Sequence, residues 1–167
     1  ERFKIRTVSY SYLLEKDWEK ETKLLVFPGG ADLPYVQHLN GKANAKIKSF
    51  VKNGGSYLGI CAGSYYAGKF VEFAKGNKDL EVLGNRELAF FNGVVRGPAR
   101  EGFTYDSNEG VIATKINWHE EKVGTNVTNV YYHGGGFFVD AEKMTGIKVL
   151  SNYNDIKKPA IIEGKYG

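Results

Sequence analysis

The chain has only one cysteine among its 167 residues, so it can form no internal disulfide bond. This scarcity favours a reducing compartment, and we expect a cytoplasmic location. Long hydrophobic runs are also lacking, since none approaches the roughly 20 residues that a membrane-spanning helix requires. We therefore expect no membrane partner.

The sequence also lacks the combined basic and aromatic motif that is typical of nucleic-acid binding. The formal net charge is +4, but the lysines are scattered and form a solvated surface, so we expect no nucleic-acid partner. A content of 42% hydrophobic and 14% aromatic residues is typical of a globular chain. We expect a single domain over residues 1–167, truncated at both ends, because strand-like alternation begins at once and the last residues resemble an unfinished hairpin.

The single cysteine lies between two glycines, in the stretch Gly59-Ile60-Cys61-Ala62-Gly63. Residues 56–60 are typical of a short buried strand and residues 62–70 of a helix, so Cys61 occupies a sharp turn with the layout of a nucleophile elbow. The partial positive charge at the start of the helix favours the thiolate of a catalytic cysteine. The alternative is that Cys61 is a small buried hydrophobic residue.

The first half of the chain alternates between strand and helix patterns. We expect strands over residues 3–10 and 23–27, the second of them buried, and helices over residues 12–19 and 44–52. A strand, a crossover helix and a second strand favour parallel pairing, so the ends of strands 23–27 and 56–60 meet at one edge of a sheet. The rest of the chain is strand-like, at residues 81–95, 111–118, 126–132, 148–153 and 160–163.

A thiolate that attacks a carbonyl group needs hydrogen-bond donors for the oxyanion that forms. The backbone N–H of Ala62, at the start of the helix, is one candidate, and the loop at Gly29-Gly30 supplies the other because glycine lets the backbone approach a ligand closely. Gly63 belongs to the same turn. The alternative for Gly29-Gly30 is a tight turn without a binding role.

Of the three histidines, His133 is the best candidate for a general base. It ends an apolar strand and precedes Gly134, where a ligand can approach the backbone. An imidazole with a purely structural role beside a glycine turn is the alternative. His38 fits a structural or exposed position, and His119 fits an exposed hairpin.

Asp32 and Glu87 are further candidates for substrate binding. Asp32 follows the glycine loop closely enough to touch a substrate, although capping of a helix is the alternative. Glu87 lies where a charged stretch leads directly into an apolar strand. We expect no metal and no cofactor.

Four segments together resemble a known family: residues 25–35, 54–63, 86–91 and 97–99. They are similar to the N-terminal domain of eukaryote-type biotin-protein ligases, which also occurs as separate bacterial proteins. The resemblance runs across nearly the whole chain. It implies an α/β fold of the class I glutamine amidotransferase-like type, flavodoxin-like, with a mainly parallel sheet, flanking helices and a β-rich second half.

In class I glutamine amidotransferases a cysteine attacks the side-chain amide of glutamine, aided by a His-x-Glu pair late in the sequence. By resemblance, Cys61 matches the nucleophile, and Gly30 and Ala62 match the oxyanion positions. The late pair does not appear in this chain, and we expect its counterpart to lie beyond Gly167. The triad is then completed outside these residues, by His133, or not at all.

The sequence therefore predicts a glutamine amidotransferase-like domain with a cysteine site for amide or related carbonyl chemistry, acting as an amidotransferase or amidohydrolase. The alternative is a non-catalytic ligand-binding or regulatory module that keeps the crevice without a working triad. The chain has no Gly-Arg-Gly-type adenylate loop, so we do not expect it to ligate biotin by itself. The expected partners are a small-molecule substrate or ligand and a biotin-ligase or other synthetase domain.

Overall fold

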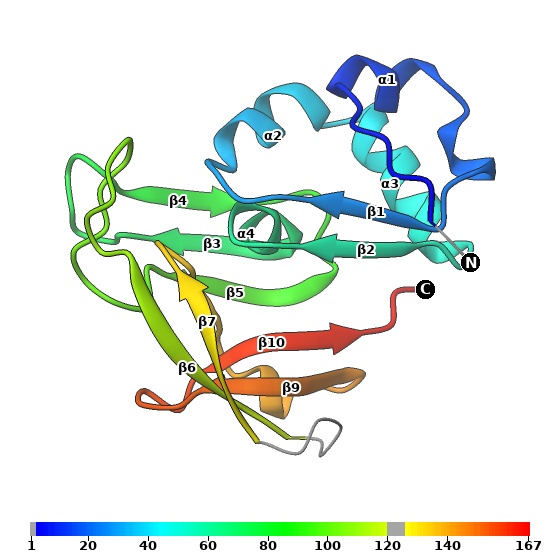
Figure 1. Cartoon of the computed structure of the whole chain (residues 1–167). Coiled ribbons are helices and arrows are strands. Elements are labelled where there is room, and N and C mark those ends of the chain that lie inside the picture. The colour runs from blue at the N-terminus through cyan, green and yellow to red at the C-terminus, as the bar shows by residue number, and fades with distance from the viewer. Residues whose placement is uncertain (1–2, 120–125) are drawn as a thin grey trace.

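The computed structural model describes residues 3–119 and 126–167 as a mixed α/β molecule with a strand-rich second half, as the sequence predicts (Figure 1). Its elements, in chain order, are α1 (Tyr10–Glu15), η1 (Trp18–Lys20), β1 (Leu24–Phe27), α2 (Leu33–Leu39), α3 (Lys42–Lys52), β2 (Ser56–Gly59), α4 (Ala62–Ala67), β3 (Gly68–Phe73), β4 (Val82–Asn85), β5 (Phe91–Gly97), β6 (Ile112–Trp118), β7 (Val127–Tyr132), β8 (Phe137–Phe138), η2 (Ala141–Lys143), β9 (Ile147–Tyr153) and β10 (Pro159–Gly164). None of the described helices is long and apolar enough to cross a membrane.

Strands β1 and β2 pair in parallel, with Phe27 opposite Gly59, as the crossover through α3 predicts. Side chains alternate along β1: Leu25 and Phe27 are buried, whereas Leu24 and Val26 are about half exposed. The strand is thus buried on one face only, not on both as expected. The reason is that α2 and α3 pack on the side to which Leu25 and Phe27 point (Figure 1).

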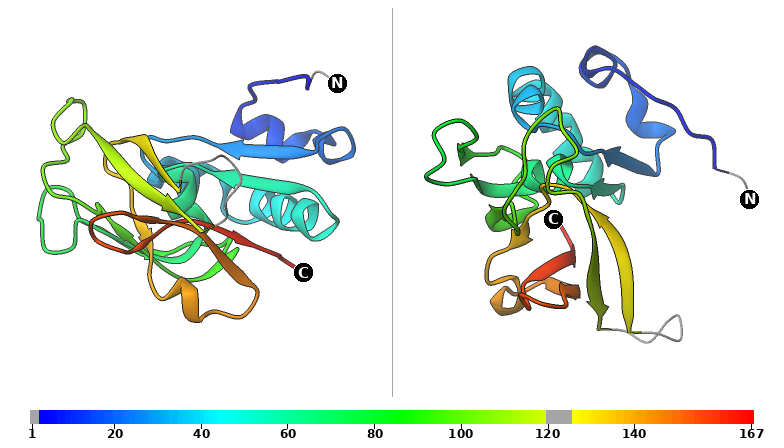
Figure 2. Two further views of the ribbon diagram at one scale, coloured as in Figure 1. Left: turned by 60° about the horizontal axis from the view of Figure 1, so that its bottom comes forward. Right: turned by 60° about the vertical axis from the view of Figure 1, so that its left-hand side comes forward.

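Two four-stranded sheets complete the fold, in the orders β4-β3-β5-β8 and β10-β9-β6-β7. Only β3 and β5 pair in parallel within them, and the second sheet is antiparallel throughout. The prediction of a mainly parallel sheet is therefore wrong for the described residues. Neighbours such as β9 and β10 are joined by residues 154–158 alone, and so short a connection permits only antiparallel pairing. Figure 2 shows the β6–β7 and β9–β10 hairpins on the side away from α1, α2 and α3.

Helix α4 ends at Ala67, and the residues that follow form β3, so the prediction of a helix as far as Phe70 is wrong. The chain leaves the helix at Gly68, whose backbone is extended. A Cβ at Gly68 would lie 2.6 Å from Cγ2 of Val95, so the glycine lets the start of β3 lie directly against β5. Because α4 packs against β1, β2, β3 and β5, it fixes the turn at Cys61 relative to the sheets.

Residues 3–9 form no strand, contrary to the prediction. Phe3 and Ile5 are 88% and 92% exposed, and none of the strand pairings among the described residues includes this segment. The segment is held to α1 by Arg6, whose Nη1 donates a hydrogen bond to the Tyr12 hydroxyl at 2.8 Å. Alternating hydrophobic residues without a neighbouring strand thus remain an extended tail.

Candidate functional site

Cys61 occupies the sharp turn between β2 and α4 with a φ of 52° and a ψ of −108°. Residues other than glycine rarely adopt positive φ, so the backbone at Cys61 is strained. The turn is compact because of its flanking glycines. A Cβ at Gly59 would collide with the backbone of Gly63, and a Cβ at Gly63 would collide with the carbonyl oxygen of Phe27.

Two of the predicted backbone donors meet at the Cys61 sulfur. The N–H groups of Gly30 and Ala62 both donate towards it, and a Cβ at Gly29 would lie 3.4 Å from the Cys61 Cβ. Gly63 differs, since its N–H is bound to the carbonyl oxygens of Pro28 and Ile60 at 3.2 and 3.0 Å. The N–H groups of Gly30 and Ala62 are thus directed at the sulfur, whereas that of Gly63 is bound within the turn.

The Cys61 thiol is not activated in the way the helix position suggests. Burial raises the pKa of Cys61 and outweighs the N–H groups of Gly30 and Ala62, which lower it; the carboxylate of Asp32 adds to the rise. The partial positive charge at the start of a helix as short as α4 is too small to offset the effect of burial on the thiol pKa. The expectation that the helix keeps Cys61 as a thiolate is therefore corrected: the neutral thiol is favoured.

His133 lies beside Cys61 through its backbone. The Cys61 thiol is 3.9 Å from the His133 carbonyl oxygen, while the imidazole Nε2 is 3.0 Å from the carbonyl oxygen of Glu109. A carbonyl oxygen can only accept a hydrogen bond, so Nε2 is the donor in this contact. The ring also packs against Phe103, with centroids 4.8 Å apart.

Gly134 shapes the wall next to the thiol. It has a φ of 69°, and a Cβ there would lie 2.6 Å from the ring of Phe103. Its carbonyl oxygen accepts a hydrogen bond from the buried Tyr65 hydroxyl at 3.0 Å. The turn that carries His133 and Gly134 is therefore held in place by α4, the helix that follows Cys61.

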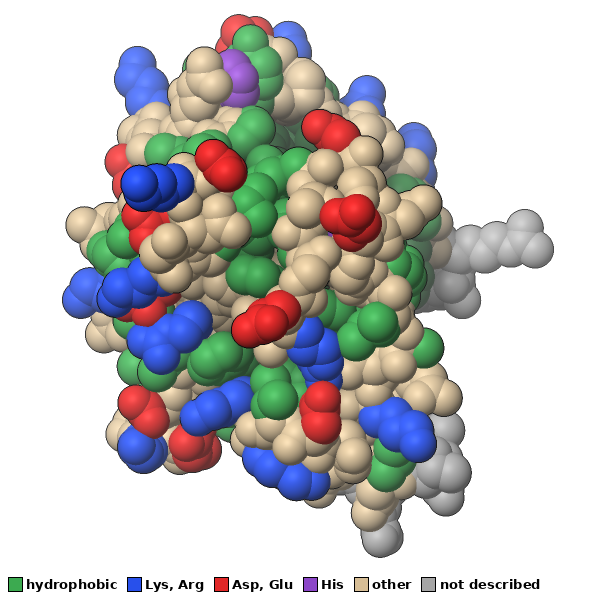
Figure 3. Space-filling view, turned by 90° about the vertical axis from the view of Figure 1, so that its left-hand side faces the viewer, with side chains coloured by type: hydrophobic (Ala, Val, Ile, Leu, Met, Phe, Trp, Pro, Cys, Tyr) green, Lys and Arg blue, Asp and Glu red, His purple; other side chains and the backbone are tan. Residues whose placement is uncertain are grey.

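Cys61 opens into a cavity of about 480 Å³ between the two halves of the chain. Figure 3 shows hydrophobic side chains in the middle of the face that it draws, with both carboxylate and Lys or Arg side chains around them. The lining residues are Gly30, Ala31, Asp32, Cys61, Ala62, Tyr65, Val71, Phe73, Val82, Phe103, Tyr105, Asp106, His133 and Gly134. The structure thus brings six of the predicted site residues into one cavity: Gly30, Asp32, Cys61, Ala62, His133 and Gly134.

Asp32 reaches the cavity without capping α2. It stands at the N-cap position, but its side chain makes no capping hydrogen bond; instead its Oδ2 accepts from Nε of Arg86 at 2.7 Å. Both side chains are almost fully buried. The capping interpretation is therefore wrong, and Asp32 is one half of a buried ion pair at the cavity wall.

Glu87 lies away from this lining. Its Oε2 accepts hydrogen bonds from the N–H of Gly41 at 2.7 Å and from Nδ2 of Asn44 at 2.9 Å, so it binds the first turn of α3. His38 is exposed and stacks on Tyr10, with centroids 4.4 Å apart. His119 is exposed at the end of β6, but Glu120 and Glu121, which follow it, lie outside the described residues. Within those residues, no group of His, Cys, Asp and Glu is arranged to hold a metal ion.

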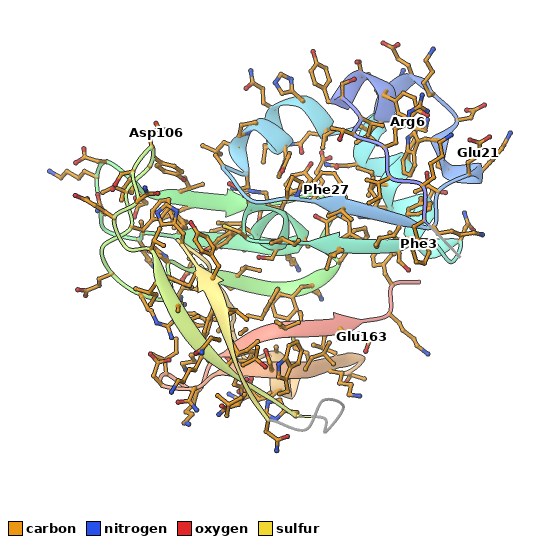
Figure 4. All side chains as sticks on the ribbon, viewed as in Figure 1. Phe3, Arg6, Glu21, Phe27, Asp106 and Glu163 are labelled. Atoms are coloured by element: carbon orange, nitrogen blue, oxygen red, sulfur yellow. The ribbon has the colours of Figure 1, made fainter. Side chains whose placement is uncertain are left out.

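Sequence reasoning missed the residues of the β5–β6 connection that line the cavity, namely Phe103, Tyr105 and Asp106. Figure 4 labels Asp106 at the outer tip of this connection. The only signal in the sequence is a pair of aromatic residues followed by an aspartate in a loop flanked by glycines. That pattern is equally typical of an ordinary surface loop.

Comparison with known proteins gives a family match over almost the whole chain. A family model described as biotin-protein ligase, N terminal, matches residues 1–165. The biotin–protein ligase of Schizosaccharomyces pombe (strain 972 / ATCC 24843) is 39% identical over 99% of this chain and 27% of its own length. An uncharacterized protein of Chlamydia muridarum (strain MoPn / Nigg) is 39% identical over 87% of this chain and 55% of its own length. The chain therefore spans about a quarter and about half of these two relatives.

Proposed function

Because the chain belongs to the family of biotin-protein ligase N-terminal domains, we propose that its Cys61 cavity is a nucleophile-elbow site for amide or related carbonyl chemistry. The observation that carries this proposal is the meeting of three features at one sulfur atom. Cys61 has strained backbone at a strand-to-helix turn, the N–H groups of Gly30 and Ala62 converge on it, and it opens into a cavity. An oxyanion formed beside the sulfur is within reach of the same two donors.

In the proposed reaction the Cys61 sulfur attacks the carbonyl carbon of a carboxamide. The carbonyl oxygen becomes an oxyanion that accepts hydrogen bonds from the Gly30 and Ala62 N–H groups. The C–N bond then breaks, and the thiol proton leaves with the nitrogen as ammonia or an amine. Water hydrolyses the resulting thioester, giving a carboxylic acid and restoring the thiol.

We assign the proton transfer to His133. Since burial raises the pKa of Cys61, the thiol must lose its proton as it attacks and needs a base nearby. His133 lines the same cavity, and because its Nε2 contacts Glu109, we assign the acceptance of that proton to Nδ1. Asp32 and Gly134 line the same cavity and bind the substrate next to the carbonyl group.

We also propose a specific fold, a partner and a location for this domain. A class I glutamine amidotransferase-like, flavodoxin-like fold is supported by the parallel β1–β2 pair with the cysteine at the carboxyl end of β2. The relative from Schizosaccharomyces pombe is named a biotin–protein ligase, and we propose that this domain associates with a ligase or other synthetase domain. A cytoplasmic location is supported by the single cysteine.

One observation favours a second function, a ligand-binding or regulatory module without turnover. The Cys61 thiol has a raised pKa and donates to the backbone of His133, and no hydrogen bond joins it to an imidazole within the described residues. The described residues thus hold no thiolate–imidazolium pair of the cysteine-protease type at Cys61. A cavity of this kind can hold a small molecule without cleaving it.

The two functions are separated by acylation with p-nitrophenyl acetate. We expect nitrophenol release over several turnovers and an acetyl group on Cys61 by mass spectrometry, both lost in Cys61→Ser. His133→Ala should slow turnover by about 100-fold or more, whereas His38→Ala, which alters an exposed histidine, should not. If Cys61 reacts no faster than N-acetylcysteine at equal thiolate concentration, the catalytic proposal is overturned and the binding module is favoured.

A further inference from the structure

The carboxylates that line the Cys61 cavity have no Lys or Arg beside them in the described lining. Of the described residues that line it, none is Lys or Arg, whereas Asp32 and Asp106 both contribute carboxylates. The charge of Asp32 is balanced by its buried partner Arg86, which lies behind it. Among the described lining residues, the exposed Asp106 is therefore the carboxylate without an opposite charge, although the chain as a whole carries a net charge of +4.

The wall next to Asp106 is aromatic. Phe103 and Tyr105 pack edge to face with centroids 5.0 Å apart, and Phe73 lies 5.5 Å from Phe103 and 6.3 Å from Tyr105. Tyr105 is 43% exposed, so a ligand in the cavity can reach its ring. The faces of aromatic rings attract cations, and a carboxylate at the same mouth adds to that attraction.

A carboxylate on the ligand finds no matching group here. Its recognition usually requires an Arg or Lys side chain, and none lies in the described lining. The N–H groups of Gly30 and Ala62 are directed at the Cys61 sulfur, where the carbonyl oxygen of the substrate belongs. A carboxylate on the ligand would therefore lie beside Asp106 without a cationic partner.

We propose that the cavity selects amides or related carbonyl compounds that carry a cationic group, such as an ammonium, and discriminates against those that carry a carboxylate. The carbonyl group lies at Cys61 between the two backbone donors. The cation lies towards the mouth, against Tyr105 and Asp106. This inference rests on the proposed function for the identity of the reacting group, but the charge preference can be measured without turnover.

The charge preference is tested with two methanethiosulfonate reagents, one bearing an ethylammonium and the other an ethylsulfonate group. In each reaction the Cys61 thiolate attacks the sulfenyl sulfur, a mixed disulfide forms and methanesulfinate leaves. Each rate is divided by that of the same reagent with N-acetylcysteine. We expect the cationic reagent to be favoured by about fivefold, although the net charge of +4 by itself favours the anionic one.

Asp106→Asn should remove most of this preference. Asn tolerates the positive φ of 55° at this position, so the loop conformation is kept. Asp140→Asn is the matched control, because Asp140 is also exposed, has a φ of 53° and lies outside the cavity lining. The two variants change the net charge equally. An anionic preference in the unaltered chain, or equal effects of the two substitutions, would overturn the proposal.

A second measurement uses two amides of opposite charge, L-glutaminamide and N-acetyl-L-glutamine. Both carry the same side-chain carboxamide, but only the first has an ammonium and only the second a carboxylate. We expect glutaminamide to slow the alkylation of Cys61 by iodoacetamide at concentrations at least about tenfold lower. Protection without ammonia release would support the charge preference while the catalytic proposal fails. Equal protection or equal ammonia release from both amides would overturn the charge preference alone.

Discussion

Asp32 shows how a single residue can serve the cavity and the stability of the molecule at once. Its carboxylate faces the cavity on one side and holds the Nε of Arg86 on the other. The Nη1 of Arg86 donates to the carbonyl oxygen of Asn85, while Nη2 is buried with no hydrogen-bond partner in the described structure. The guanidinium therefore depends on Asp32 as its only ionic partner among the described residues.

Asp32→Asn should lower the free energy of unfolding by about 3 kcal/mol, because it leaves a buried guanidinium without a counter-charge. Asp140→Asn should change it little, since Asp140 pairs with Lys143 on the exposed surface. Urea denaturation followed by circular dichroism measures both. Equal midpoints for the two variants would show that the buried pair contributes nothing beyond an exposed one.

At the residue scale, the sequence predicted the sharp turn at Cys61 but not the ion pair between Asp32 and Arg86. Gly59 and Gly63 flank Cys61 within five consecutive positions, so their spacing is visible in the sequence and indicates a tight turn. Asp32 and Arg86 are 54 positions apart, and only the packing of α2 against the start of the β4–β5 connection joins them. A charged residue near a helix start indicates capping by default, which is why the sequence offers capping as an alternative for Asp32 and does not indicate the ion pair with Arg86.

The β2–α4 turn depends on how closely the helix approaches β1. Gly63 lies in the first turn of α4 with its Cα directly against the carbonyl group of Phe27, and its N–H is bound to Pro28 and Ile60. A methyl group at Gly63 has no flexible side chain to displace. The backbone of β1 or of α4 would have to move, and either movement shifts Cys61 relative to Gly30.

Gly63→Ala should lower the free energy of unfolding by about 2 kcal/mol or more through this overpacking. A loss of stability would be informative, because replacing glycine by alanine within a helix ordinarily raises the free energy of unfolding by roughly 1 kcal/mol. The control is Gly146→Ala, where a φ of +79° adds strain but nothing lies within 4 Å, and the loss should be about 1 kcal/mol. Guanidinium denaturation measures the free energy of unfolding of both variants. Stabilisation by Gly63→Ala would contradict the described packing.

At the scale of elements, local pattern predicted strands β6, β7, β9 and β10 within a residue or two, because each alternates and ends at turn residues. It failed where tertiary contacts override the local preference. Residues 68–70 continue a helical pattern, yet they pair with β4 and β5 as part of β3. Residues 3–9 alternate like a strand, yet they pair with none of the described strands. Pairing partners decide strand formation, and no single segment encodes them.

Across the whole molecule, buried tyrosines connect elements that are distant in sequence. The Tyr65 hydroxyl donates to Gly134, Tyr153 donates to Gly136 at 2.9 Å, and Tyr66 donates to Oδ1 of Asn44 on α3 at 2.8 Å. Burial raises the pKa of each, and for Tyr66 to about 12. These hydroxyl groups must stay protonated to keep donating the three hydrogen bonds, of which the one from Tyr65 joins the two halves of the chain.

The protein should therefore lose stability at alkaline pH before its buried tyrosines ionise in the folded state. A tyrosine in the unfolded chain has a pKa near 10, so the contribution of Tyr66 is fully present below that pH and is lost as the pH rises towards about 12. Tyr66→Phe should flatten the fall in unfolding free energy between these values, at a cost of about 1–2 kcal/mol at neutral pH because Asn44 loses a donor. Tyr131→Phe, at a side chain that is 74% exposed, should leave the slope unchanged. Urea midpoints across the pH range, with tyrosinate absorbance as a second signal, measure the slopes, and identical slopes in the two variants would contradict the assignment to Tyr66.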